Sequence, residues 1–171
     1  APGERNYHIF YELLVGLDES DLDKYYLTNM TAEDFRLTNS SGTFDRRDGV
    51  DDYDTFEDLQ KAMHTMGFDK IERENILSVT SALLHCSNLE FIAISADECE
   101  IKRDSSSLEP ILSLLGFTVE ALNRALCYFS IKAGKETHTR SLPKAKAAKG
   151  LLGLIKGDCW LMTTPFVECC F

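Results

Sequence analysis

Apolar side chains recur three and four positions apart in several segments of this chain, a spacing that places them on one face of an α-helix. The first stripe contains Tyr7, Phe10 and Leu14, and Gly16 follows as a residue suited to ending a helix. Further stripes follow along the chain: Phe56, Leu59, Met63 and Met66; Ile76, Val79, Leu83 and Leu84; Leu108, Ile111, Leu112 and Leu115; Leu122, Leu126 and Phe129; Ala148, Leu151, Leu152 and Ile155. This pattern predicts a mainly helical fold.

Residues that favour helix starts precede several of these stripes. Asp54 and Glu57 have the spacing of a capping box, in which each side chain accepts a hydrogen bond from the other residue's backbone N–H. Asp69 and Glu72 have the same spacing. Thr118 stands where the next N-cap is expected. We therefore predict helices that begin after Asp54, Asp69 and Thr118.

The remaining segments carry weaker signals. Leu22 and Tyr25 indicate a short second helix, whereas residues 28–53 are rich in Asn, Ser, Gly and Asp and predict a long loop with little regular structure. Leu89–Ile94 is the best strand candidate. Residues 130–142 are expected to be extended, with a bend at 133–135. The predicted fold class is mainly α, with one or two short β elements.

Charge is unevenly distributed along the 171 residues. The whole chain has 18 basic and 28 acidic side chains, a net charge of −10, but residues 131–171 have 7 basic and 3 acidic side chains. The overall acidity argues against a nucleic-acid partner, which requires a basic surface. The basic end is compatible with an acidic protein partner or simply with a solvated helix face, and the charges alone leave both readings open.

Other features bear on the cellular compartment. No apolar run approaches the roughly 20 residues that a membrane-spanning helix needs, and no signal peptide opens the chain. The six cysteines lack paired spacing, which fits free thiols in a reducing compartment. We expect a cytoplasmic protein without a membrane partner.

Motifs that bind metals or nucleotides are not found in the sequence. The acidic stretch 45–58 departs from a calcium-binding EF-hand, because aligning Gly49 with its glycine puts Phe44 and Arg46 at ligand positions. No GxxxxGK[ST] motif is present to hold nucleotide phosphates. His85 adjoins Cys86, and a Cys–His nucleophile pair stays open although nothing further supports one. We predict no metal site.

A series of ordered blocks is more specific. Gly3–Leu14 reads GERNYHIFYELL and resembles the GERNYHIFYxLL segment of myosin motor domains. Further blocks similar to that family follow in the same order, namely Gly49–Asp52, Met66–Phe68, Leu83–His85, Leu114–Gly116, 133–136 and 149–156. By this resemblance the chain is identified as a member of the myosin motor-domain family. The resemblance divides it into a partial motor domain, residues 1–158, and a non-matching tail, residues 159–171.

The resemblance implies a position within the motor. In myosins this region is the upper fifty-kilodalton subdomain of the larger α/β P-loop motor domain, and it lies between the two switch elements. The P-loop, the NxNSSRFGK switch I and the DxxGFE switch II do not occur in this sequence, and Thr38–Gly42 only superficially resembles switch I. We therefore predict no catalytic or nucleotide-binding residue and no cofactor in this chain, although intact myosins use Mg-ATP, and we expect no ATP hydrolysis by the chain alone.

The resemblance also implies two sets of functional residues. The actin-facing loop of the family corresponds to about Ile131–Pro143, with Lys132, Lys135, Glu136 and Arg140 as candidates for contact with the filament. An ordinary hairpin with solvated lysines is the alternative. A second set, Glu4, Arg5, Asn6 and His8, is implied to couple the subdomain to the switch region. Its alternative is structural, with Glu4 favoured at a helix N-terminus.

Two functions remain open at this stage. The chain is either part of an ATP-driven motor that moves on actin filaments, or a stand-alone helical module that binds actin or another protein without ATPase activity. The implied partners are the actin filament and the rest of the myosin head. The implied location is the cytoskeleton, in a myosin complex.

Overall fold

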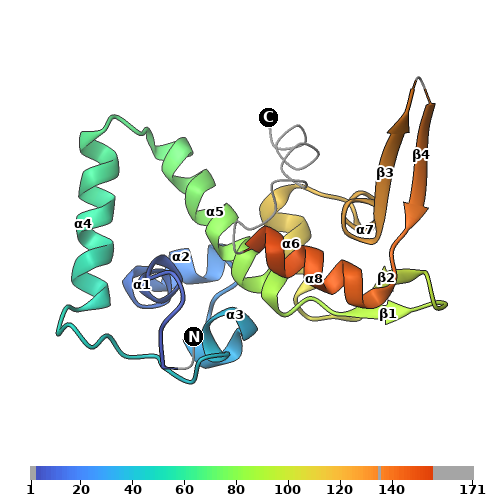
Figure 1. The fold of residues 1–171 in the computed structure, drawn as a ribbon. Coiled ribbons are helices and arrows are strands. Elements are labelled where there is room, and N and C mark those ends of the chain that lie inside the picture. Colours follow the sequence, from blue (N-terminus) through green and yellow to red (C-terminus); the bar gives the residue numbers. More distant parts are fainter. Residues whose placement is uncertain (1–2, 135, 156–171) are drawn as a thin grey trace. The chain divides into compact units, whose positions relative to one another are not determined.

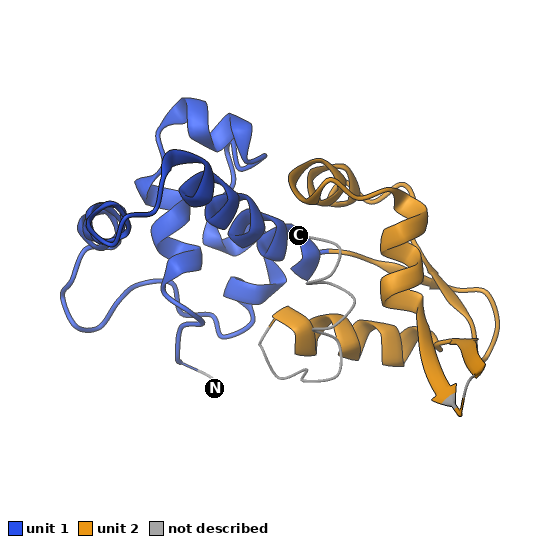
Figure 2. Ribbon diagram, turned by 90° about the horizontal axis from the view of Figure 1, so that it is seen from above, with its two compact units in different colours: residues 1–88 blue, residues 89–171 orange. Residues whose placement is uncertain are grey.

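The computed structural model describes residues 3–134 and 136–155. The chain forms two compact units, residues 1–88 and residues 89–171 (Figure 2). Helices dominate both units, and the strands form two antiparallel sheets of two strands each (Figure 1). The predicted mainly helical fold with short β elements is confirmed. Ala1, Pro2, Lys135 and the predicted tail 159–171 lie outside the described residues.

Unit 1 is built around its first helix. Its elements are α1 (Ile9–Gly16), α2 (Glu19–Lys24), the 3₁₀ helix η1 (Ala32–Asp34), α3 (Arg36–Asn39), α4 (Asp52–Thr65) and α5 (Lys70–Ser87). Helix α1 packs against both α4 and α5 (Figure 1). Leu13 and Phe35 have no exposed surface. A methyl group added at Gly16 would lie 2.3 Å from ring atoms of Phe56, so this glycine permits close packing of α1 on α4.

The structure corrects two predictions in this unit. Residues 28–53 do not form one irregular loop, because η1 and α3 lie within them. Thr31 and Asp34 form a capping box that begins η1, and the carboxylate of Asp34 accepts a hydrogen bond of 2.7 Å from Thr31 N–H. Helix α4 begins at Asp52, and its N-cap is Asp51, whose side chain accepts a 2.7 Å bond from Tyr53 N–H. The predicted start at Asp54 is therefore wrong.

Helix α5 confirms one prediction and corrects another. Asp69 and Glu72 form the expected capping box, with both hydrogen bonds at 2.8 Å. The buried face of the helix, however, includes Leu77 and Leu84, while Val79 from the predicted stripe is exposed. The predicted stripe is therefore partly right: Leu84 belongs to the buried face, whereas Ile76 and Val79 are exposed, and the buried face also includes the small Ser81 and Ala82.

The described part of unit 2 combines two hairpins with three helices. Its elements are β1 (Phe91–Ala93), β2 (Cys99–Ile101), α6 (Leu108–Leu115), α7 (Val119–Cys127), β3 (Tyr128–Ala133), β4 (Glu136–Ser141) and α8 (Lys144–Ile155). Strand β1 pairs with β2, and β3 pairs with β4. Helix α7 packs on β2, and α8 packs on α7 and on the first hairpin. The side-chain amide oxygen of Asn123 accepts a 2.9 Å bond from Ile101 N–H, which fixes α7 to β2.

Most local predictions for unit 2 are confirmed. Thr118 caps α7 by accepting a 3.2 Å bond from Ala121 N–H, and Gly116 ends α6 in the left-handed conformation with φ of 67°. The extended segment turns at Gly134, as expected, but β3 already begins at Tyr128. The short strand β2 was not predicted. Helix α8 buries Ala147 rather than the predicted Ala148, and Leu152 is exposed.

No single helix among the described residues combines the length and apolar character needed to cross a membrane. Helices α6 and α7 meet these criteria only as a pair, and they bend by 102° at the break between them.

Candidate functional site

Arg5 connects the segment before α1 to the start of α4. Its Nη2 atom lies 2.7 Å from Oδ2 of Asp52, the first residue of α4. Its guanidinium also lies over the ring of Tyr11, with Cζ 3.8 Å from the ring centroid. Only 5% of the Arg5 side chain is exposed. The charge of Arg5 is thus held inside unit 1 by one carboxylate and one aromatic face.

Asn6 connects the same segment to α3. Its side-chain Nδ2 donates a 2.9 Å hydrogen bond to the backbone oxygen of Leu37, and its backbone N–H donates to the Tyr11 hydroxyl at 3.2 Å. That hydroxyl in turn donates to the backbone oxygen of Thr38 at 3.2 Å. Arg5 and Asn6 therefore both position α1, Arg5 against α4 and Asn6 against α3.

Arg46 joins the carboxylates around Arg5 into one ion-pair network. Its Nη1 atom lies 3.5 Å from Oε1 of Glu12 and 3.7 Å from Oδ1 of Asp52, and its Nη2 atom lies 2.7 Å from Oδ2 of Asp48. The hydrogen bond from Arg46 holds the pKa of the Asp48 carboxyl well below its ordinary value. Glu12 is buried on α1. We call Arg5, Glu12, Arg46, Asp48 and Asp52 the ion-pair network.

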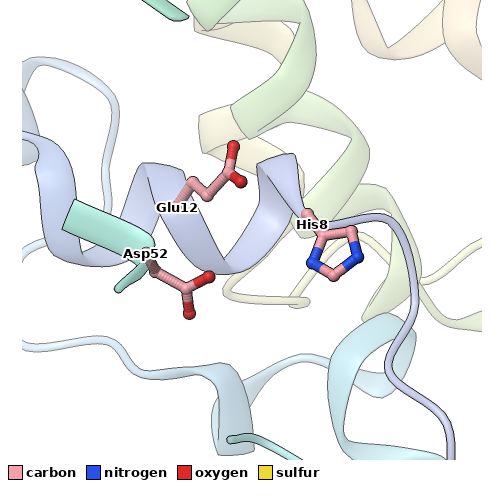
Figure 3. Close-up of side chains that lie close together, drawn as sticks. All are labelled: His8, Glu12 and Asp52. Atoms are coloured by element: carbon pink, nitrogen blue, oxygen red, sulfur yellow. The ribbon is translucent and has the colours of Figure 1, made fainter. Parts of the chain in front are cut away.

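His8 lies at the edge of this network. The potential ligand atoms of His8, Glu12 and Asp52 all lie within 4.8 Å of one another (Figure 3). A histidine and two carboxylates are a donor set that binds divalent metals. Here, however, Arg5 and Arg46 already lie against these carboxylates and balance their charge. The arrangement fits an ion-pair network better than a metal site.

The structure thus separates the four residues expected to couple to the switch region. Arg5 and His8 lie at the ion-pair network, and Asn6 binds the backbone next to α3. Glu4 is exposed ahead of them. The sequence did not point to Arg46 and Asp52, because both lie in residues 28–53, which were predicted to form a long loop with little regular structure. Two arginines, at 46 and 47, inside that stretch were a signal that some of its carboxylates are paired.

The second candidate region is the hairpin of β3 and β4, which projects away from the helices of unit 2 (Figure 1). Residues directly opposite each other in an antiparallel pair lie on the same face of the sheet. Phe129 lies opposite Arg140 and Ile131 opposite His138, and Glu136, two residues before His138 in β4, lies on the same face. We call the face with these residues the Phe129 face. The Nε2 atom of His138 lies 3.4 Å from Oε2 of Glu136 along this face.

The other face of the hairpin is polar. Ser130 lies opposite Thr139, with their hydroxyl oxygens 3.3 Å apart, and Lys132 lies opposite Thr137. We call this the Lys132 face. The predicted filament-contacting residues are therefore divided, with Glu136 and Arg140 on one face and Lys132 on the other. Lys135 is outside the described residues.

His85 and Cys86 do not form a reactive pair. His85 is buried and packs edge-to-face on Phe35, with ring centroids 5.6 Å apart. Burial lowers the pKa of His85, an effect opposed by hydrogen bonds with the backbone at Tyr25 and Tyr26. Burial raises the pKa of the Cys86 thiol to about 12. The thiol therefore stays protonated at neutral pH, which removes the basis for a nucleophile here.

Both units are largely helical, and unit 2 adds a hairpin of β3 and β4 with exposed side chains. Residues 1–157 match the family model described as myosin head (motor domain). The chain belongs to this family, as the sequence blocks predicted.

Known myosins from distant organisms are similar to this chain. Myosin-1 of Saccharomyces cerevisiae is 34% identical over 89% of this chain and 8% of its own length. Unconventional myosin-Ib of Homo sapiens is 35% identical over 85% of this chain and 13% of its own length. The non-muscle myosin-2 heavy chain of Acanthamoeba castellanii is 35% identical over 85% of this chain and 9% of its own. The chain thus spans about a tenth of the length of these relatives.

Proposed function

We propose that this chain acts as part of a myosin head, and that the intact protein is an ATP-driven motor that moves on actin filaments in the cytoplasm. Membership of the motor-domain family supports the proposal, as do similarities of 34–35% to named myosins. The partners are then the actin filament and the remainder of the head.

The observation that carries the actin contact is the projecting hairpin of β3 and β4. Its described charged side chains, Lys132, Glu136, His138 and Arg140, are all exposed. Residues 131–171 also have 7 basic and 3 acidic side chains in an otherwise acidic chain. Exposed charges of this kind speed the encounter with an acidic partner and are weakened by salt.

Co-sedimentation with actin filaments tests this contact. The chain is compared with a Lys132→Ala/Lys135→Ala/Arg140→Ala variant over a range of salt concentrations. We expect the unmodified chain to bind filaments and the variant to bind more weakly at low salt. Equal binding by the two proteins would remove the hairpin from the contact.

The segment before α1 is proposed to couple this subdomain to the switch region of the intact head. Support comes from Arg5, which bonds both to Asp52 on α4 and to the face of Tyr11 on α1. A displacement of this segment would therefore act directly on α1 and α4. In an intact head, Arg5→Lys is expected to weaken the coupling between nucleotide binding and filament binding. The separate affinities for the nucleotide and for the filament should change less.

If the chain is instead a stand-alone binding module, its coding sequence should lack the nucleotide-binding motifs of a motor. Sequencing the full transcript separates the two functions. A P-loop upstream and a DxxGFE motif downstream support the motor, and a complete reading frame without them supports the module.

A further inference from the structure

Two buried cysteines meet where α7 packs on β2. Cys99 is the first residue of β2 and Cys127 is the last residue of α7, and neither side chain has exposed surface. Both are free thiols. The Cys127 thiol lies within hydrogen-bonding range of the Cys99 thiol and of the backbone N–H of Ile101. Unit 2 therefore contains two thiols in mutual contact.

The packing of α7 on β2 holds these two thiols together. The side-chain oxygen of Asn123 on α7 accepts a 2.9 Å hydrogen bond from Ile101 N–H on β2. Cys127 follows Asn123 by four residues, which places both on one face of the helix, about 6 Å apart along its axis. Cys99 precedes Ile101 by two residues, which places both on one face of the strand at a similar spacing of about 7 Å. The bond between Asn123 and Ile101 therefore brings Cys127 beside Cys99.

The two cysteines also belong to different hairpins of unit 2. Cys99 lies opposite Ala93 in the pairing of β1 with β2. Cys127 is followed directly by Tyr128, the first residue of β3, and its backbone oxygen accepts a 2.7 Å hydrogen bond from Leu142 N–H. A covalent bond between the two sulfurs would thus join the first hairpin to the base of the second.

Burial controls how readily this pair reacts. Removal from water raises the pKa of the Cys127 thiol, and the contact with Cys99 raises it further. Because the thiolate is the reactive form of cysteine, the closed pair reacts slowly at neutral pH. Reaction therefore requires a transient opening of the contact between α7 and β2, which admits solvent and an oxidant.

We propose that Cys99 and Cys127 form a redox-sensitive pair, which a peroxide oxidises to a disulfide that holds α7 on β2. One thiolate sulfur attacks a peroxide oxygen and the O–O bond breaks, which gives a sulfenic acid and, after uptake of a proton, one water. The sulfur of the other thiol then attacks the sulfenic sulfur, the S–O bond breaks, and a second water leaves with the thiol proton. The two sulfurs together lose two electrons, and hydrogen peroxide is reduced to two waters.

Peptide mapping of the full chain tests this proposal. The folded chain is treated with hydrogen peroxide in neutral buffer without denaturant, its remaining thiols are alkylated, and cross-linked peptides are identified by mass spectrometry. Every protein compared also carries Cys159→Ser, Cys169→Ser and Cys170→Ser, so that thiols outside the described residues do not exchange with the pair. We expect a cross-link between Cys99 and Cys127 that dithiothreitol removes.

Cys86→Ser is the matched control, because Cys86 is also a buried thiol but lies on α5 of unit 1. This variant should keep the cross-link, whereas Cys127→Ser should lose it. Peroxide should also raise the midpoint of thermal unfolding of the Cys86→Ser protein by about 5 °C or more, since a disulfide restricts the unfolded chain. The Cys127→Ser protein should show no such increase.

The opposite results are equally clear. A folded chain that forms no cross-link between Cys99 and Cys127 over several hours would overturn the proposal, because both thiols would then be inert core residues. A cross-link that forms only in urea-unfolded chain, or one that joins Cys86 to either residue equally well, would overturn it too. These measurements involve neither nucleotide nor filament, so they leave the proposed function untouched.

Discussion

Arg5 and Asp52 form an ion pair whose Nη2 and Oδ2 atoms are 2.7 Å apart, with side chains only 5% and 18% exposed. Loss of one partner leaves a charge inside unit 1 without its closest counter-charge. Arg5→Met should therefore lower the free energy of unfolding by about 2–4 kcal/mol, measured by urea denaturation. Lys61→Ala removes an exposed pair with Asp58 on α4 and should cost less than about 1 kcal/mol. Similar losses in both variants would contradict a special role for the buried pair.

The close packing of α1 on α4 depends on Gly16. Gly16→Ala would place a methyl group 2.3 Å from the Phe56 ring, so the helices must move apart at a cost of about 1–3 kcal/mol. Thermal unfolding measures the effect. In a double-mutant cycle, Phe56→Ala removes the clashing ring but keeps the Cβ atom, which lies 2.6 Å from the added methyl group, so Gly16→Ala should cost less in that background without becoming harmless. Additive effects in the cycle would show that the two residues do not interact.

Stability should depend on pH through His85. Its pKa in the folded chain is below the ordinary value of 6.5, so the unfolded state binds more protons as the pH falls through that value. The contribution of His85 to stability is therefore present above the unfolded pKa and is lost as the pH decreases toward the folded pKa. Urea midpoints should fall between about pH 7.5 and 5.5 in the unmodified chain and fall less in His85→Gln.

His64 provides the matched control for this dependence, because it is an exposed histidine on α4. His64→Gln should keep the pH dependence of the unmodified chain. If His64→Gln removes that dependence and His85→Gln does not, burial of His85 is not its cause. The carboxyls with lowered pKa, such as Asp48 and Glu74, lose their contribution only at more acidic pH.

The chain alone should not bind Mg-ATP. Its sequence lacks the GxxxxGK[ST] motif whose backbone N–H groups hold phosphates. Isothermal titration calorimetry of the folded chain with Mg-ATP should show no saturable heat in the micromolar range. Stoichiometric binding would contradict the proposal that the nucleotide site belongs to other parts of the head.

Local signals made much of the fold predictable. The capping box of Asp69 and Glu72 and the N-cap Thr118 involve residues within one helical turn, so short-range sequence spacing was enough to find them. The buried side of α5 was not predictable in this way. Val79 and Leu77 are both suitable core residues, and packing against other helices decides which of them is buried.

For the candidate sites, too, local sequence signals predicted some features, and contacts between distant residues determined the others. The hairpin was predicted from its extended residues and its turn, but its two faces require the pairing register, which separates Lys132 from Arg140. The ion-pair network joins Arg46 to Glu12, which is 34 residues away, and no local pattern predicts that distance. Family resemblance indicated where functional residues lie, and the fold determined which of them act together.

The central claim, that this chain is a working part of a myosin head, is tested most directly by substitution into a known motor. Residues 3–155 would replace the matching segment of human unconventional myosin-Ib, a relative with 35% identity. The account predicts a folded chimera whose ATP turnover is stimulated by actin filaments, and in which Lys132→Ala/Lys135→Ala/Arg140→Ala weakens that stimulation. A folded chimera that binds Mg-ATP but shows neither filament binding nor stimulated turnover would contradict it.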